Sequence, residues 1–95
     1  MLYAIICTDK PRSLALRQKN RPDHVAFLEG FGSKLKAAGP FLDEAGDPNG
    51  SLVVMEAASR AEAQAAAALD PYVKAGLFAH VEVRPWNWLI NNPER

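Results

Sequence analysis

Cysteine is nearly absent from this sequence, with Cys7 the single one among 95 residues. One cysteine forms no internal disulfide, and Cys7 lies in an apolar stretch, where a free thiol usually packs as a small hydrophobic side chain. Long hydrophobic runs are absent too, because no stretch approaches the roughly 18 consecutive apolar residues of a transmembrane helix. No basic segment precedes the apolar N-terminal stretch, as it would in a secretory signal. We therefore expect a cytoplasmic protein with no membrane partner.

An excess of charge of either sign is also missing. Eleven Lys and Arg residues balance eleven Asp and Glu residues, so the chain lacks the positive field that attracts nucleic acid. The two histidines and one cysteine are scattered without the spacing of metal ligands, and no glycine-rich phosphate-binding loop occurs. We expect no nucleic-acid partner, no metal ion and no cofactor.

The hydrophobic patterns and turn signals predict one domain over residues 1–95. Hydrophobic residues make up 48% of the chain, which suffices for a small core. The expected elements are, in order, a strand at 2–7, a short helical segment at 13–19, a helix from Pro22 to Gly39 and Pro40, a strand at 41–45, a turn at 47–50, a strand at 52–55, a helix capped by Ser59 with Glu62 three residues later and ending near Leu69, and an edge strand at 80–84.

This order of elements is the ferredoxin-like β-α-β-β-α-β arrangement of the α+β class. It implies a four-stranded antiparallel sheet with both helices on one face. The first strand, residues 2–7, is apolar on both of its faces, and the helices cover just one of them. Because soluble monomers rarely expose so large an apolar patch, we expect a homodimer whose sheets pack face to face.

His24 is the most informative residue of the chain. On a helical wheel it lies in the middle of an apolar stripe with Leu28, Phe31 and Leu35. In the first turn of a helix that begins near Pro22, the partial positive charge of the helix N-terminus disfavours the protonated ring. A neutral, partly buried imidazole is suited to act as a general base. The alternative is a core histidine whose ring N–H donates to a backbone carbonyl.

Asp70 is expected at the same edge of the sheet as His24, because the topology places the start of the first helix beside the end of the second. Asp70 also suits the cap of a short helical turn, with Pro71 at its first position and Gly76 as its end. One carboxylate can cap a turn and accept a ring N–H at once. A His–Asp pair favours acid–base chemistry, and capping alone is the alternative. Ser51 lies in no nucleophile-elbow motif, which disfavours a hydrolytic triad.

Residues 10–21 form a basic segment without an acidic residue, and this segment leads into His24. A guanidinium in it, Arg17 or Arg21, is suited to hold an anionic group of a ligand, such as a carboxylate. An ordinary solvated surface segment is the alternative, since isolated exposed charges contribute little energy.

Several short motifs, taken in order over nearly the whole chain, resemble the YciI-like (YCII-related) proteins. These motifs are Met1-Leu2-Tyr3, Arg21-Pro22 with His24, Ala38-Gly39-Pro40, Gly50-Ser51, Asp70-Pro71-Tyr72-Val73 and Val83-Arg84-Pro85-Trp86. The resemblance implies a dimeric α+β barrel and an active site with a His and an Asp, which fall here on His24 and Asp70. One such protein is a dehydrochlorinase of a chlorinated hydroxyhydroquinone, and related barrels include muconolactone isomerase. These activities imply proton abstraction from small oxygenated rings.

We therefore expect a cofactor-independent lyase or isomerase that acts on a small anionic or phenolic molecule. His24 is expected to be the base and Asp70 the group that orients it. The residues expected to bind substrate are Arg17, Arg21, Ser51 and Tyr72. The alternatives are a binding or accessory dimer that holds a metabolite without converting it, and a dimer in which His24 and Asp70 serve stability alone.

Overall fold

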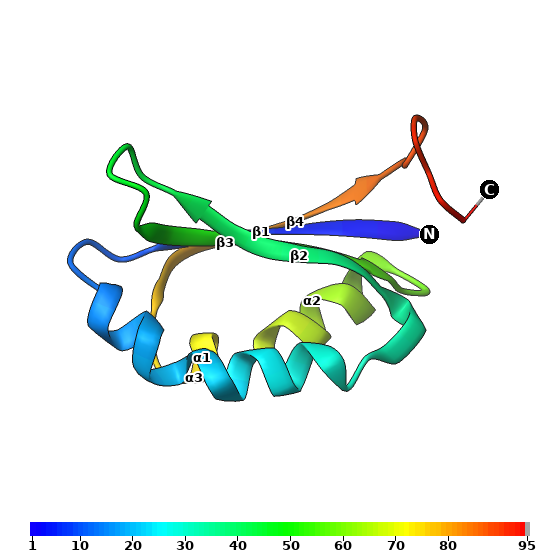
Figure 1. The fold of residues 1–95 in the computed structure, drawn as a ribbon. Helices are drawn as coiled ribbons and strands as arrows, with labels where there is room; N and C mark the ends of the chain where they lie inside the picture. Colours follow the sequence, from blue (N-terminus) through cyan, green and yellow to red (C-terminus); the bar gives the residue numbers. More distant parts are fainter. Residues whose placement is uncertain (95) are drawn as a thin grey trace.

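The computed structural model describes residues 1–94 as a sheet with helices on one of its faces (Figure 1). The elements are β1 (Leu2–Asp9), α1 (Leu14–Glu29), the 3₁₀ turn η1 (Gly32–Lys34), β2 (Leu35–Leu42), β3 (Pro48–Glu56), α2 (Arg60–Ala68), α3 (Pro71–Lys74) and β4 (Phe78–Trp86). Within residues 1–94, no helix is long and apolar enough to cross a membrane.

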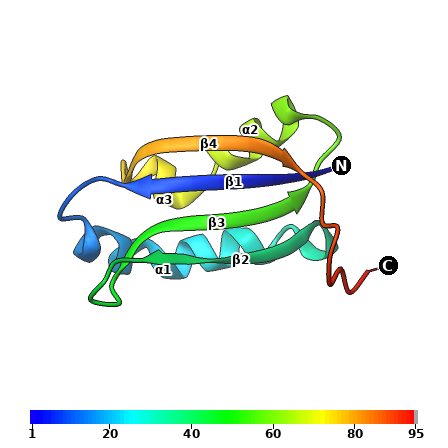
Figure 2. The same ribbon diagram turned by 90° about the horizontal axis from the view of Figure 1, so that it is seen from above.

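The described strands form one antiparallel sheet in the order β2-β3-β1-β4. This order confirms the predicted ferredoxin-like α+β fold, with β1 in the interior of the sheet and β4 at its edge. Figure 2 shows α1 running along the β2 side, whereas α2 and α3 lie toward β1 and β4. Alternate residues of β1, among them Tyr3, Ile5 and Cys7, are buried in the core that the sheet shares with the helices.

The predicted start of the first helix near Pro22 is wrong. The expected short segment and the expected longer helix are one continuous helix, α1, which spans 16 residues and holds Pro22 in its interior. Pro22 lacks the N–H that would bond to the carbonyl of Gln18, but both residues are exposed, so water can satisfy that carbonyl. His24 therefore lies ten residues after Leu14, where the charge of a helix N-terminus no longer acts on its ring.

The predicted end of this helix at Gly39 and Pro40, and the strand predicted at 41–45, are also wrong. The chain leaves α1 at Gly30, and Gly32 adopts a φ of +58°, a conformation that favours glycine. Strand β2 then begins at Leu35, so the last residue of the supposed apolar stripe is not helical. Pro40 is tolerated in β2 because an edge strand has an unpaired side that needs no N–H.

The turn predicted at 47–50 lies a few residues earlier. The carboxylate of Asp43 accepts hydrogen bonds from the backbone N–H groups of Ala45 and Asp47, which closes the turn before β3 begins. Gly50 thus belongs to β3, where a Cβ atom would lie 2.5 Å from the carbonyl oxygen of Cys7. The close approach that glycine permits sets Ser51 beside β1.

Two predicted caps are confirmed. The Ser59 hydroxyl accepts from the backbone N–H of Glu62 at the start of α2. The Asp70 carboxylate accepts from the backbone N–H of Tyr72 at the start of α3, and Gly76, with a φ of +75°, follows the end of that turn. These caps fix where the chain leaves the helical layer to enter β4.

Stability at high pH tests the burial of Cys7. Burial raises the pKa of its thiol from 9.0 to about 12, the charges of Asp70 and Asp9 act in the same direction, and Arg17 opposes them. Between pH 9 and about 12 the unfolded chain loses this proton while the folded chain keeps it. The free energy of unfolding should therefore fall as pH rises in this window, by up to about 1.4 kcal/mol per pH unit. Urea denaturation at several pH values measures how steeply the free energy of unfolding falls with pH. This fall should be less steep for Cys7→Ala than for the wild type. An equal fall in the two proteins would contradict the raised pKa of Cys7.

Candidate functional site

His24 and Asp70 meet in the structure as expected, although His24 lies in the interior of α1 and not at its start. The Nδ1 atom of His24, in the interior of α1, lies 2.9 Å from both carboxylate oxygens of Asp70, which stands between α2 and α3. Oδ1 of Asp70 also accepts from the backbone N–H of Tyr72 at 2.9 Å, so capping and the histidine contact occur together. Both side chains are buried. Because a carboxylate accepts hydrogen bonds, Nδ1 is the donor, and Nε2 is the ring nitrogen left to accept a proton.

Tyr72 packs directly on this histidine. Its ring is stacked on that of His24 with a centroid distance of 3.9 Å and an interplanar angle of 16°. The guanidinium carbon of Arg17 lies 4.7 Å from the centroid of the Tyr72 ring, a cation–π distance. Burial raises the pKa of the Tyr72 phenol, although the positive charges of Arg17 and Arg21 act in the opposite direction. Tyr72 is therefore a neutral hydroxyl that holds one face of the imidazole.

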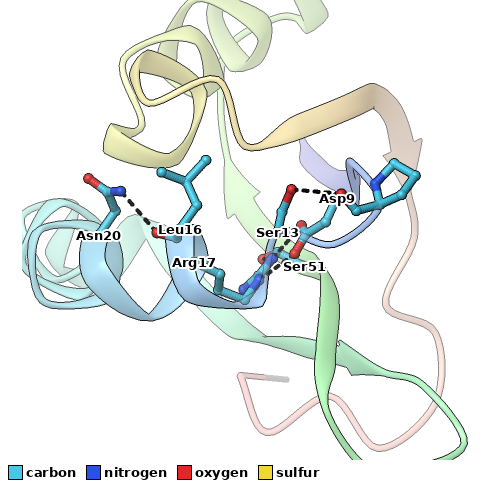
Figure 3. A network of polar contacts seen from close by, with 7 residues as sticks. Asp9, Ser13, Leu16, Arg17, Asn20 and Ser51 are labelled. Atoms are coloured by element: carbon cyan, nitrogen blue, oxygen red, sulfur yellow. Dashed lines mark hydrogen bonds and ion pairs between the residues drawn. The ribbon is translucent and has the colours of Figure 1, made fainter.

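Arg17 is buried and joins β1 to β3 (Figure 3). Its Nε and Nη2 atoms donate to the two carboxylate oxygens of Asp9 at 2.7 and 2.8 Å, and Nη2 also donates to Oγ of Ser51 at 2.9 Å. Burial alone would lower the pKa of Arg17, but the hydrogen bond and charge of Asp9 outweigh it and raise the pKa above its ordinary value. Arg17 is thus a fixed cation with an internal partner.

Asp9 is the member of this network that sequence reasoning missed. It ends β1 directly after the apolar run, at the edge to which the topology brings the basic segment. An acidic residue at that strand end, opposite a segment rich in arginine, is the signal that could have identified it. Its side chain is 4% exposed, so its pairing with Arg17 is a buried salt bridge.

A cavity of about 290 Å³ lies between α1 and β2. Five of the six residues expected at the site line it: Arg17, Arg21, His24, Ser51 and Tyr72. Asp70 does not line it and stands behind His24, against a small apolar cavity in the core. Arg21 is exposed, and within residues 1–94 its guanidinium forms no ion pair or hydrogen bond with the protein.

The arrangement offers a base, a cation and neutral hydroxyl groups around one space. In the described part of the chain, no three His, Cys, Asp or Glu side chains gather as they would around a metal ion. The chemistry that these residues can supply is proton transfer at His24, with charge recognition by Arg21.

The fold and the site define a small ferredoxin-like α+β protein with a buried His–Asp pair at a cavity. The model of the YCII-related domain matches residues 1–87, and the chain belongs to this family. Protein YciI of Escherichia coli O6:H1 (strain CFT073) is 42% identical over 94 residues, covering 90% of this chain and 96% of the relative. An uncharacterized protein of Haemophilus influenzae is 34% identical with the same coverage.

The chain is also similar to proteins of solved structure. The 5-chloro-2-hydroxyhydroquinone dehydrochlorinase of Burkholderia phenoliruptrix AC1100, in complex with 2,5-dihydroxybenzoquinone, is similar with a TM-score of 0.84 and 38% identity, over 92% of this chain and 94% of that one. An antibiotic biosynthesis monooxygenase, 17% identical with a TM-score of 0.57, shares the fold alone.

Proposed function

We propose that this protein is a cofactor-independent lyase or isomerase that transfers protons on a small hydroxylated or anionic organic molecule. The observation that carries the proposal is the buried His24–Asp70 pair, in which His24 lines the cavity with Nδ1 held by Asp70 and Nε2 left to accept a proton. The similarity to a dehydrochlorinase of a hydroxylated ring supports the same class of substrate. A volume of about 290 Å³ lies at the small end of ligand pockets, which suits a single ring.

His24 is the proton acceptor in this proposal. Its Nε2 takes a proton from a carbon or hydroxyl of the substrate, and Asp70 stabilises the imidazolium that forms. In an elimination, the electron pair of the broken C–H bond forms a new double bond, and the leaving group departs from the neighbouring carbon as an anion. In an isomerisation, the imidazolium returns the proton to a different carbon. Tyr72, stacked on the ring, keeps Nε2 in one orientation.

The proposal is tested by coupling binding to proton exchange. A thermal-shift screen over hydroxylated aromatics, lactones and dicarboxylates, with 2,5-dihydroxybenzoquinone among them, should identify ligands that raise Tm. A bound ligand should then exchange a carbon-bound proton with deuterated solvent, as followed by NMR. Ligands that bind without any exchange would assign the protein to the binding or accessory class. Failure of every compound to bind would contradict the proposed substrate class.

Arg21 is proposed to hold the anionic group of the ligand, because Arg17 is already paired with Asp9. Arg21→Ala should weaken binding of an anionic ligand by about 1.5 to 3 kcal/mol if a charge-assisted hydrogen bond is lost. Isothermal titration calorimetry measures this difference. Lys19→Ala removes a neighbouring exposed charge that does not line the cavity, and it serves as the control. Equal affinities of wild type and Arg21→Ala would place Arg21 among ordinary surface charges.

We also propose that the protein is a homodimer whose open sheet faces pack together. The helices cover one face of the sheet (Figure 1), and the other presents apolar side chains such as Ile6, Leu52 and the exposed Trp86. Sedimentation equilibrium should give the mass of two chains, and Leu52→Glu should shift the protein toward one. A well-folded wild-type monomer at micromolar concentration would overturn the dimeric barrel.

A further inference from the structure

We infer that Ser51 is the oxyanion donor of the site: Arg17 fills an acceptor position on its oxygen and leaves the hydroxyl proton for an oxygen of the substrate. This inference rests on the proposed function and adds a role that the His–Asp pair does not supply. It also narrows the substrate class to molecules in which the removed proton leaves negative charge on an oxygen, as in a phenolate or an enolate.

The hydroxyl of Ser51 accepts one hydrogen bond from the protein. A serine hydroxyl has one proton to donate and two lone pairs that accept. The Nη2 group of Arg17 donates to Oγ at 2.9 Å, so one lone pair is used. Among residues 1–94, no protein acceptor receives the proton of Ser51. The side chain is 3% exposed, and it lines the cavity together with His24. A buried donor without a protein acceptor, at the wall of a cavity, is suited to a ligand oxygen.

Arg17 and the sheet hold this donor in a fixed position. Arg17 cannot turn away, because Asp9 holds Nε and Nη2 by two hydrogen bonds. Ser51 itself lies within β3, where it pairs with Cys7 of β1 on one side and with Pro40 of β2 on the other. Its backbone is therefore held by both neighbouring strands. A cation that donates to a hydroxyl oxygen also strengthens the hydrogen bond that the hydroxyl then donates. Arg17 is thus a positioning residue, and Ser51 is the group that contacts the substrate.

Ser51 is not placed to act as a nucleophile. Within the described residues, Ser51 forms no hydrogen bond with His24, whose Nδ1 is held by Asp70. Ser51 is therefore not activated by the base, and no bond to its oxygen forms. When His24 removes the proton of a ligand hydroxyl, the charge stays on the ligand oxygen and the Ser51 hydroxyl donates to it. Donors fixed in advance at such an oxygen are a large source of catalysis.

The probe for this role is 4-nitrophenol, whose phenol and phenolate forms absorb at different wavelengths. At a pH one unit below the pKa of the free probe, wild-type protein should bind it largely as phenolate, because His24 takes its proton. Ser51→Ala should lower the bound ratio of phenolate to phenol by about 10- to 100-fold, as expected for one lost hydrogen bond to a charged oxygen. Ser13→Ala removes a hydroxyl that bonds to the carbonyl of Pro11 outside the cavity, and it should leave the ratio unchanged.

A second ligand distinguishes a lost donor from a damaged cavity. The affinity for 4-nitroanisole, which cannot ionise, should be the same in wild type and in Ser51→Ala. If the wild type ionises 4-nitrophenol and Ser51→Ala does so equally, the inference is overturned while the proposed function stands. If Ser51→Ala weakens both ligands alike, Ser51 shapes the cavity and is not the donor. If the wild type binds 4-nitrophenol only as the phenol, proton removal by His24, and with it the proposed function, is contradicted.

Discussion

Replacing Arg17 with methionine is expected to lower the free energy of unfolding by about 3 to 5 kcal/mol. The substitution keeps most of the aliphatic packing but leaves the carboxylate of Asp9, with 4% of its side chain exposed, buried without its cation. The cation–π contact with Tyr72 is lost as well. Urea denaturation followed by circular dichroism measures the change, and the slope of the transition should stay the same if both proteins unfold in a two-state manner.

Two control variants show whether the loss comes from leaving the buried carboxylate of Asp9 unpaired or from removing a positive charge in general. Arg21→Met removes an exposed arginine from the same helix, and its effect should stay within about 0.5 kcal/mol. Adding Asp9→Asn to Arg17→Met should recover part of the loss, since no unpaired charge then remains buried. A loss below about 1 kcal/mol for Arg17→Met would show that the pair is hydrated, as exposed ion pairs are.

Replacing His24 with glutamine is expected to lower kcat by about 10²- to 10⁴-fold for any substrate that the binding and exchange screen identifies, since that is the usual contribution of a general base. Asp70→Asn should also lower kcat, because an amide does not stabilise the imidazolium by charge. Asparagine caps helices as well as aspartate does, so the start of α3 should survive this change. The thermal midpoint of Asp70→Asn should therefore stay near that of the wild type.

The double variant tells whether the two residues act as one unit. If they do, the double variant should be about as slow as the slower single variant, and the losses should not add. Additive losses would indicate two independent roles. Full activity in both single variants, with lowered stability in each, would favour the view that His24 and Asp70 serve the fold alone.

The sequence predicted those parts of the structure that local physics determines. The apolar run of β1, the capping box at Ser59 and the cap at Asp70 each follow from side chains within a few residues of one another. The contact of His24 with Asp70 was predicted from a helix start near Pro22, and it forms although His24 lies in the interior of α1.

The predicted helix and strand bounds were wrong where tertiary contacts outweighed a local sequence signal. Pro22 is a strong sign of a helix start, yet α1 passes through it because both sides of the missing hydrogen bond are exposed and the buried residues Arg17 and His24 flank it. Gly39 and Pro40 are typical of a helix end, but both residues belong to the edge strand β2 because they pair with β3. The pairing of Asp9 with Arg17 joins two elements and has no periodic signature in either.

The most direct test of proton removal by His24 is deuterium incorporation into 1,2,4-trihydroxybenzene, measured by NMR in deuterated buffer without oxygen. As His24 takes a hydroxyl proton, the neighbouring ring carbon accepts a deuteron and a keto tautomer forms. Loss of the original proton from that carbon, with return of a proton to the oxygen, restores the ring with one C–D bond. We expect rapid exchange with wild-type protein and a rate near that of buffer with His24→Gln. Equal exchange with both proteins, or no exchange above that of buffer when the ligand is bound to the wild type, would contradict proton removal by His24.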